Sequence, residues 1–274
     1  MREGGIQQRI GDTLGEPAGA RIRFTELRAR SLLNHCQSRR MPDCWTINPY
    51  RGCSFGCTYC YARYTHSFLG LEDPTAFERE IFVKRDAGTV LQREATAARL
   101  RARPIAIGTA TDPYQPAEAR YHVTADILTV LARYWGLRVS ITTKSALIVR
   151  DRVLLQRLAR RSTVRIHVSL ACRDRALARR LDPGAPTPER RLHTVRALAE
   201  AGLAVGLSAV PILPGINDSE AALRELFEAA RGQGVGWVQV APLFLASASR
   251  RHFLRWLGES CTELRPRYGE LFYS

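Results

Sequence analysis

Three cysteines lie close together in the sequence, at the spacing C-x3-C-x2-C: Cys53, Cys57 and Cys60. The chain holds seven cysteines in all, an odd number that argues against a framework of disulfides and favours metal or redox chemistry. Three thiolates are one short of a complete tetrahedral zinc site. They suit a [4Fe–4S] cluster in which one iron stays open to a small chelating ligand. Gly52 and Gly56 let the loop bend tightly around such a group.

Two other interpretations of this loop stay open from the residues alone. A zinc ion bound by the three thiolates would take its fourth ligand from His66, His35 or Cys44. Alternatively, the three cysteines are unrelated buried thiols, which behave as small hydrophobic side chains. The remaining cysteines are too scattered in the sequence to form a second compact motif, so we predict a single cluster.

The charge of the chain is strongly positive and unevenly distributed. Its 274 residues include 41 Lys and Arg against 26 Asp and Glu, a formal net charge of +15, and only Lys84 and Lys144 are lysines. Between Arg150 and Arg196 there are thirteen arginines and four acidic residues, a net charge of +9. Such a surface favours DNA, RNA or a nucleotide as partner, because Arg binds phosphate through two hydrogen bonds. The alternative is a merely solvated surface in an Arg-rich chain.

Several function classes are disfavoured by what the sequence lacks. No apolar run approaches the ~20 residues needed to span a bilayer. The first thirty residues are polar and lack the apolar centre of a secretory signal. We therefore expect a cytoplasmic protein with no membrane partner. No Gly-rich phosphate loop or GxGxxG motif is present, so the sequence does not support use of a nucleoside triphosphate or a dinucleotide.

Short apolar strands alternate with helical patterns from Cys44 onward, and these elements must position the cysteine loop. We expect strands at 45–48, 104–108, 138–142, 164–170, 203–210 and 235–241. Expected helices span 86–100, 118–134, 149–161, 188–201 and 219–231, the last capped by Asn217 or Asp218. Six strand–helix repeats imply a parallel sheet but fall short of the eight of a closed barrel. The sequence predicts an α/β fold, a partial (β/α)6 TIM-type barrel, with its site at the C-terminal ends of the strands.

The predicted barrel carries short N-terminal and C-terminal extensions. Residues 1–44 are expected to form a basic N-terminal extension with a short helix around Phe24–Asn34, followed by a connector at 39–43. Residues 45–246 would form the catalytic partial barrel. Residues 247–274 would form a helical tail with an aromatic-rich helix and an irregular end.

The neighbours of the cysteines make the loop similar to that of the radical S-adenosylmethionine (SAM) superfamily, in the branch related to spore photoproduct lyase. The resemblance covers roughly residues 45–245. The residues that carry it are Asn48-Pro49-Tyr50-Arg51-Gly52-Cys53, Cys57, Tyr59-Cys60-Tyr61-Ala62-Arg63, Gly108-Thr109-Ala110-Thr111-Asp112-Pro113-Tyr114-Gln115-Pro116 and Thr143-Lys144-Ser145.

This resemblance implies that Cys53, Cys57 and Cys60 bind a [4Fe–4S] cluster and that SAM binds the open iron. The reduced cluster would cleave SAM into methionine and a 5′-deoxyadenosyl radical, which abstracts hydrogen from the substrate. Reduced flavodoxin or ferredoxin would be the electron donor. The cofactors supply the difficult chemistry, while the protein positions them and excludes water.

The resemblance also implies a set of SAM contacts at the strand ends. Asp112 would add charge pairing or cap the next turn. The other implied contacts are Thr109, Ala110 and Thr111 for the amino group, Lys144 for the carboxylate, Ser169 for the carboxylate or ribose, and Tyr59, Val210 and Pro211 near adenine.

The catalytic residues depart from the family pattern at one point. Tyr59 and Tyr61 flank Cys60, as do the tyrosines that are thought to relay the radical in spore photoproduct lyase. That lyase places a hydrogen-donor cysteine near the end of the second strand, where this chain has Thr109, Ala110 and Thr111. Cys172, just after the fourth strand, is the candidate substitute for this donor; the alternative is that it is a small buried hydrophobic side chain.

The resemblance therefore predicts a lyase-like, repair or modifying enzyme that acts on a nucleic-acid or nucleotide-like substrate. Two alternatives stay open. One is a radical SAM enzyme that modifies a peptide or a small metabolite, in which case the arginine excess has no role in binding. The other is a non-catalytic zinc or iron–sulfur module that binds nucleic acid.

Overall fold

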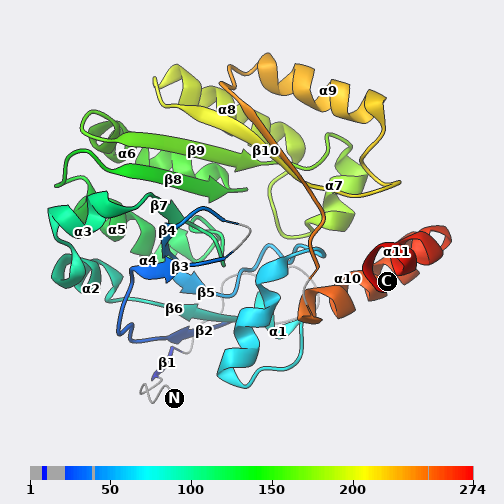
Figure 1. Cartoon of the computed structure of the whole chain (residues 1–274), viewed down its shortest axis with the longest axis horizontal. Coiled ribbons are helices and arrows are strands. Elements are labelled where there is room, and N and C mark those ends of the chain that lie inside the picture. The colour runs from blue at the N-terminus through cyan, green and yellow to red at the C-terminus, as the bar shows by residue number, and fades with distance from the viewer. Residues whose placement is uncertain (1–7, 11–21, 39–40, 246, 274) are drawn as a thin grey trace.

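The predicted series of parallel strands is present in the computed structural model, which describes residues 8–10, 22–38, 41–245 and 247–273. Across these residues one sheet has seven strands in the order β11-β10-β9-β8-β7-β4-β3 (Figure 1). Its six parallel strands are β4 (Cys44–Ile47), β7 (Ile105–Ile107), β8 (Arg138–Thr143), β9 (Thr163–Ser169), β10 (Val205–Ile212) and β11 (Val238–Pro242). Strand β3 (Asn34–Cys36) adds to β4 in the antiparallel sense. The partial (β/α)6 barrel is confirmed, since the parallel strands follow one another in chain order.

Helices cover the outer face of this sheet and form the main core with it. Alternate strand residues such as Ile107, Ile141 and Ile166 are buried against apolar helix residues such as Ile127 and Leu155. This alternation is what a strand buried on one face requires. The covering helices are α2 (Ala87–Glu94), α3 (Ala97–Ala102), α4 (Glu118–Tyr121), α5 (Val123–Leu131), α6 (Arg152–Ala159), α8 (Pro188–Glu200) and α9 (Glu220–Arg231).

Two of the expected helices are each divided in two. The expected helix 86–100 ends at Ala95, and the Thr96 hydroxyl then caps α3 by accepting a hydrogen bond from the Arg99 amide. The expected helix 118–134 is interrupted at His122, whose φ of 55° lies in the left-handed region. A cap residue and a left-handed residue each stop a helix locally, even where the apolar period continues.

Two helix starts also differ from the prediction. The expected helix 149–161 begins earlier, as the 3₁₀-helix η2 (Ala146–Asp151), which leads into α6. Ser219 caps α9 by accepting a hydrogen bond from the Ala222 amide, so the predicted caps Asn217 and Asp218 were wrong. Asn217 instead accepts a hydrogen bond from the Leu213 amide at 2.6 Å. Helix α7 (Arg175–Leu181), which follows β9, was not predicted.

The predicted helix at Phe24–Asn34 was wrong, because this segment is extended. Strand β2 (Arg23–Glu26) joins a second sheet, in the order β1-β2-β6-β5, with β1 (Gln8–Ile10), β5 (Tyr50–Arg51) and β6 (Glu80–Val83). Leu32 and Leu33 are buried next to each other, and both of their amides donate to the carboxylate of Glu94. This distant carboxylate satisfies the amides of an extended chain. The predicted connector 39–43 lies partly outside the described residues.

The C-terminal segment packs over the cysteine loop and not against the sheet. Helix α10 (Ser247–Ser260) contacts the 3₁₀-helix η1 (Tyr61–Leu69), and η3 (Thr262–Leu264) leads into α11 (Arg265–Tyr273), so the expected irregular end is largely helical (Figure 1). Phe253, Leu257 and Tyr268 are buried in one cluster with Tyr59 and Leu213. None of the described helices is long and apolar enough to cross a bilayer.

Candidate active site

The three predicted ligand cysteines occupy the loop between β5 and η1, at the C-terminal end of β4. Cys53 is buried with Phe55 and Phe77, and Cys57 and Cys60 pack against this cluster. Burial raises the pKa of all three thiols. After burial, the nearby charge of Asp182 raises the pKa of Cys57 most, and the charges of Cys60 and Cys53 raise it further. A positively charged metal group would offset this repulsion, since bound thiols are deprotonated.

Three cysteine thiols on one loop are a donor set that suits a [4Fe–4S] cluster, in which each thiolate binds a different iron. Among the described residues, no three His, Cys, Asp or Glu side chains are placed to share one metal ion. Two of the three candidates for the fourth zinc ligand are bonded to other groups. His66 contacts the Glu80 carbonyl at 2.9 Å and His35 bonds Asp43, while Cys44 lies opposite Cys36 in the pairing of β3 with β4.

Glycine shapes this loop as predicted. Gly52 has a φ of 83° and Gly56 a φ of 62°, both in the left-handed region. A Cβ atom on Gly52 would lie 2.8 Å from the carbonyl oxygens of both Phe77 and Glu80. No other residue type therefore fits at position 52 without a shift of the backbone.

Gln115 fastens the cysteine loop to the loop that follows β7. Its amide nitrogen donates to the Gly52 carbonyl at 3.0 Å and to the Thr111 hydroxyl at 3.0 Å. Its amide oxygen accepts a hydrogen bond from the Ser54 amide at 3.1 Å. Gln115 is fully buried, and sequence reasoning gave it no role.

The predicted SAM contacts after β7 border the cysteine loop. The Thr111 hydroxyl donates to the Gly52 carbonyl at 2.6 Å. Asn48 donates to the Thr109 hydroxyl at 3.0 Å and accepts from the Ala110 amide at 2.7 Å. The Tyr61 hydroxyl donates to the Thr109 carbonyl. Residues 109–111 are thus fixed between β4 and the cysteines.

Asp112 ties the ends of β7 and β8 together. One of its carboxylate oxygens accepts from the Tyr114 amide at 2.9 Å and the Thr143 hydroxyl at 2.6 Å, and the other from the Lys144 amide at 2.7 Å. Of the two roles considered for Asp112, the turn cap is present. Gly108, with a φ of 88°, makes the sharp entry into this turn possible.

Lys144 brings together the predicted residues from three strand ends. Its ammonium donates to the Ser169 hydroxyl at 2.8 Å and lies 5.4 Å from the centre of the Tyr59 ring. It also lies 4.0 Å from the carboxylate of Asp182. Burial opposes its charge, but Asp182 and Cys57 outweigh this effect and raise the pKa of Lys144. A charged ammonium is therefore held beside the cysteine loop.

Asp182 and Arg191 are the functional candidates that sequence reasoning missed. Their side chains are 3% and 1% exposed and form an ion pair at 2.9 Å. Arg191 also donates to the carbonyls of Ser169 at 3.2 Å and Pro186 at 2.8 Å. Despite burial, Lys144 and Arg191 hold the pKa of Asp182 low. A signal was present, because Arg191 precedes Thr194, Val195 and Leu198 at helical spacing, on the buried stripe of α8.

Tyr59 and Tyr61 flank Cys60 but face different surroundings. Tyr59 is 8% exposed, and its hydroxyl is buried without a hydrogen-bond partner among the described residues. Burial, followed by the nearby charge of Asp182, raises the pKa of Tyr59. Tyr61 is 40% exposed and reaches the end of β7. Cys172 is buried in the cluster that contains Tyr59, and burial raises its pKa to about 12.

The segment predicted to approach adenine belongs largely to a strand. Strand β10 continues to Ile212, two residues beyond the predicted end, so Val210 and Pro211 lie within it. The Asn217 amide nitrogen donates to the carbonyls of Pro211 at 3.1 Å and Ala171 at 2.8 Å. Asn217 therefore joins the ends of β9 and β10 beside the site.

Curated proteins from several organisms are similar to this chain in sequence. A curated protein of Mycobacterium tuberculosis is 37% identical over 268 residues, which are 97% of this chain and 78% of that protein. One from Methanocaldococcus jannaschii is 24% identical over 202 residues, 73% of this chain and 72% of that protein.

Solved structures share the fold. Spore photoproduct lyase complexed with dinucleoside spore photoproduct superposes with a TM-score of 0.63 and 17% identity, over 87% of this chain and 67% of that one. Streptococcus suis SuiB bound to S-adenosylmethionine superposes with a TM-score of 0.51 and 17% identity, over 80% and 44% of the two chains. The model of the radical SAM superfamily matches residues 47–227, a span that begins in β4 and ends in α9. The chain belongs to the radical SAM superfamily.

Proposed function

We propose that the protein binds a [4Fe–4S] cluster through Cys53, Cys57 and Cys60 and cleaves SAM reductively. One observation carries this proposal. At the C-terminal ends of the strands, Lys144 bonds Ser169 and approaches Asp182, and the charges of Lys144 and Asp182 both act on Cys57. When bound and reduced, the cluster would supply the electron that cleaves SAM into methionine and a 5′-deoxyadenosyl radical. Reduced flavodoxin or ferredoxin is the proposed electron donor, and the cytoplasm is the proposed location.

The residues of this chain bind and orient SAM. The Lys144 ammonium and the Ser169 hydroxyl, already 2.8 Å apart, together donate to the SAM carboxylate. Carbonyl and hydroxyl oxygens at Thr109, Ala110 and Thr111 accept from its amino group. The Asp112 carboxylate accepts from the amides of Tyr114 and Lys144, and it thereby holds the backbone next to this contact in place. The backbone at Val210 and Pro211 and the Tyr59 ring pack near adenine.

The remaining proposed roles concern hydrogen transfer and the exclusion of water. Tyr59 and Tyr61 would relay the radical, and Cys172 would donate its thiol hydrogen atom to the product radical and become a thiyl radical itself. The apolar cluster of Phe253, Leu257 and Tyr268 covers the Tyr59 side of the loop. A dry site strengthens the electrostatic contacts and protects a radical from side reactions.

The proposed substrate is a nucleic acid or a nucleotide, in a lyase, repair or modification reaction. The formal charge of +15 and the fold shared with a lyase that binds a dinucleoside photoproduct support this proposal. The second candidate is a peptide or small-metabolite substrate, in which case the arginine excess has no role in binding. Nucleic-acid binding that weakens steeply with salt favours the first candidate, and weak binding that is insensitive to salt favours the second.

Anaerobic reconstitution followed by a SAM-cleavage assay tests the proposal. We expect the protein to bind iron and sulfide and, with dithionite and SAM, to release 5′-deoxyadenosine. Cys57→Ala should lose both properties. Cys261→Ala is the matched control, because Cys261 is a free, half-buried thiol on the C-terminal side of α10, and it should keep both. A protein that holds a full cluster but forms no deoxyadenosine would contradict the proposed SAM cleavage. About one zinc per chain and no iron would support the alternative, a non-catalytic module that binds nucleic acid.

A further inference from the structure

The arginines of the basic segment 150–196 divide into two groups. The arginines of the first group form ion pairs or hydrogen bonds with other residues of the protein. Arg150 pairs with Glu118 and Asp151, Arg191 pairs with Asp182, and Arg180 donates to the Ser260 carbonyl. The other group includes Arg175 and Arg179 on α7 and Arg190 on α8, which are exposed. Among the described residues, none of these three arginines forms an ion pair, that is, none lies within 4.0 Å of a carboxylate oxygen. Their guanidinium groups are therefore available to a ligand.

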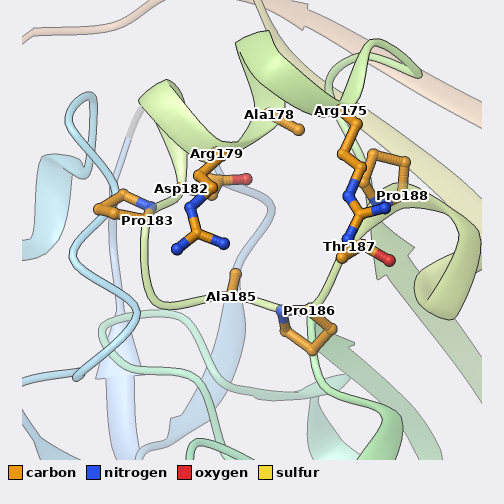
Figure 2. A pocket seen from close by; sticks show the side chains of 9 residues that line it. All are labelled: Arg175, Ala178, Arg179, Asp182, Pro183, Ala185, Pro186, Thr187 and Pro188. Atoms are coloured by element: carbon orange, nitrogen blue, oxygen red, sulfur yellow. The ribbon is translucent and has the colours of Figure 1, made fainter. Parts of the chain in front are cut away.

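The free arginines line two adjoining hollows next to the candidate active site. The smaller one, of about 40 Å³, is bounded by Arg175 and Arg179, by Asp182 and by the turn at Pro186 and Thr187. Figure 2 shows both guanidinium groups directed from α7 toward the chain at 183–188. The larger one is a groove of about 560 Å³, with Arg190 on its wall. Ala185 and Pro186 line both hollows, so the two adjoin at this turn.

The groove that Arg190 lines also borders the cysteine loop. Phe55, which lies between Cys53 and Cys57 and is buried in one cluster with Cys53, is among its lining residues. Asp182 lines the small hollow, and its carboxylate pairs with Arg191 and lies 4.0 Å from Lys144. A ligand bound at α7 would therefore lie beside Asp182, the neighbour of the proposed SAM contact Lys144.

The charge of this surface suits a phosphate. The carboxylate of Asp182 is offset by two neighbouring cations, Arg191 and Lys144, so it leaves no uncompensated negative charge in the hollow. Thr187 caps α8, a helix of 13 residues whose N-terminus adds partial positive charge to the same turn. The opposing charge is Glu189, which is exposed and lies near Arg173 and Arg175. Three free guanidinium groups outweigh it, and guanidinium binds phosphate through two parallel hydrogen bonds.

We propose that Arg175, Arg179 and Arg190 bind the phosphodiester backbone of a single-stranded nucleic acid and deliver it along the groove to the cysteine loop. Arg175 and Arg179 hold one phosphate over the Pro186–Thr187 turn, and Arg190 holds the phosphate that follows. This inference rests on the nucleic-acid substrate of the proposed function. It adds where the strand binds and in which direction it approaches the site.

Fluorescence anisotropy with a labelled single-stranded oligothymidylate tests the proposal. Binding is measured with the full chain, before and after reconstitution, over a series of salt concentrations. The test variant is the double substitution Arg175→Gln and Arg179→Gln. The matched control is Arg196→Gln with Arg224→Gln, which removes the same charge from exposed arginines that pair with Glu200 and Glu220. All four side chains are exposed, and unchanged thermal unfolding curves would show that the variants are folded.

We expect the test variant to bind about tenfold more weakly, and its slope of log K against log salt to be less steep by about 0.7 for each phosphate that the variant no longer neutralises. The control should stay within about twofold of the unsubstituted protein. Equal weakening of both variants, or binding insensitive to salt, would overturn the phosphate site. Because binding is also measured without a cluster, this result is independent of whether the protein forms deoxyadenosine.

Discussion

The buried carboxylate of Asp182 is the residue on which the electrostatics of the site depend. It lies 2.9 Å from the buried Arg191 and 4.0 Å from Lys144, whose side chain is 12% exposed. Two cations that are buried or nearly so need the charge of this one anion, because a buried charge without a counter-charge is costly. Asp182 thereby keeps both Lys144 and the cysteine loop in place.

Asp182→Asn should lower the free energy of unfolding by about 3–5 kcal/mol, since it leaves Arg191 and Lys144 without a counter-charge. Urea unfolding of the protein without cluster measures this. Asp174→Asn is the matched control, because Asp174 is an exposed cap of α7 and Asn caps a helix equally well. Equal stability of the two variants would show that Asp182 has no such role.

The residues that could be predicted from the sequence are those whose type is rare or whose spacing is local. The cysteine triplet is a local motif, and Lys144 is one of two lysines in the chain. Asp182 and Arg191 could not be paired in advance, because one ends α7, an unpredicted helix, and the other belongs to α8. Their ion pair depends on how α7 and α8 pack together, and the sequence around either residue does not indicate this packing.

At the scale of elements, the turn after α7 supports the cysteine loop directly. The Gly184 amide donates to the Phe55 carbonyl at 3.0 Å, and the Thr58 amide donates to the Leu181 carbonyl at 2.9 Å. A Cβ atom on Gly184 would lie 2.5 Å from the Ser54 carbonyl oxygen. The turn and the loop therefore approach each other as closely as two backbones allow.

Gly184→Ala should destabilise the protein by about 1–3 kcal/mol, because the new methyl group must displace the backbone of the cysteine loop. Iron bound after reconstitution should fall in parallel. Gly269→Ala is the control, since no atom lies within 4 Å of a Cβ at this position in α11. The control should be neutral or stabilising by about 0.5–1 kcal/mol. Full iron binding by Gly184→Ala would show that the loop tolerates the displacement.

The packing of α10 over η1 should make stability depend on pH. Burial, together with the nearby charges of Arg63 and Arg255, lowers the pKa of His252 to about 4. Because the unfolded chain binds the proton more readily, His252 favours the folded state above its ordinary pKa of about 6.5, and this contribution is lost as pH falls toward 4.

Urea unfolding at about pH 7 and about pH 5 measures this loss. His252→Gln should lose less stability on acidification than the unsubstituted protein. His193→Gln, which changes an exposed histidine on α8, should follow the unsubstituted protein. An identical decrease in all three proteins would exclude His252 as the cause.

The fold was predictable where local patterns and tertiary contacts agree. Runs such as Val164–Leu170 alternate in burial as their sequence indicates, and the six parallel strands follow. The N-terminal segment was not predictable, because the spacing of Phe24, Leu32 and Leu33 also fits a helix. Its extended form depends on Glu94, more than sixty residues away, which satisfies two backbone amides. Similarly, α10 packs on η1 through contacts that no local pattern encodes.

At the scale of the whole molecule, one charge distribution should affect stability and binding in opposite directions. A formal charge of +15 on 274 residues repels itself in the compact state, and salt screens that repulsion. Salt also weakens exposed ion pairs such as Arg196–Glu200, but each of these contributes only about 0.3–0.5 kcal/mol. Self-repulsion should therefore dominate.

The melting temperature of the protein without cluster should rise between about 0.01 M and about 0.1 M sodium chloride, as the Debye length falls from about 30 Å to about 10 Å. Affinity for the oligothymidylate should fall over the same range, because counterion release weakens as salt increases. Thermal scans and anisotropy titrations in the same buffers measure both trends, and potassium chloride should reproduce them if ionic strength is the cause. A melting temperature that falls with salt would mean that ion pairs outweigh the net charge.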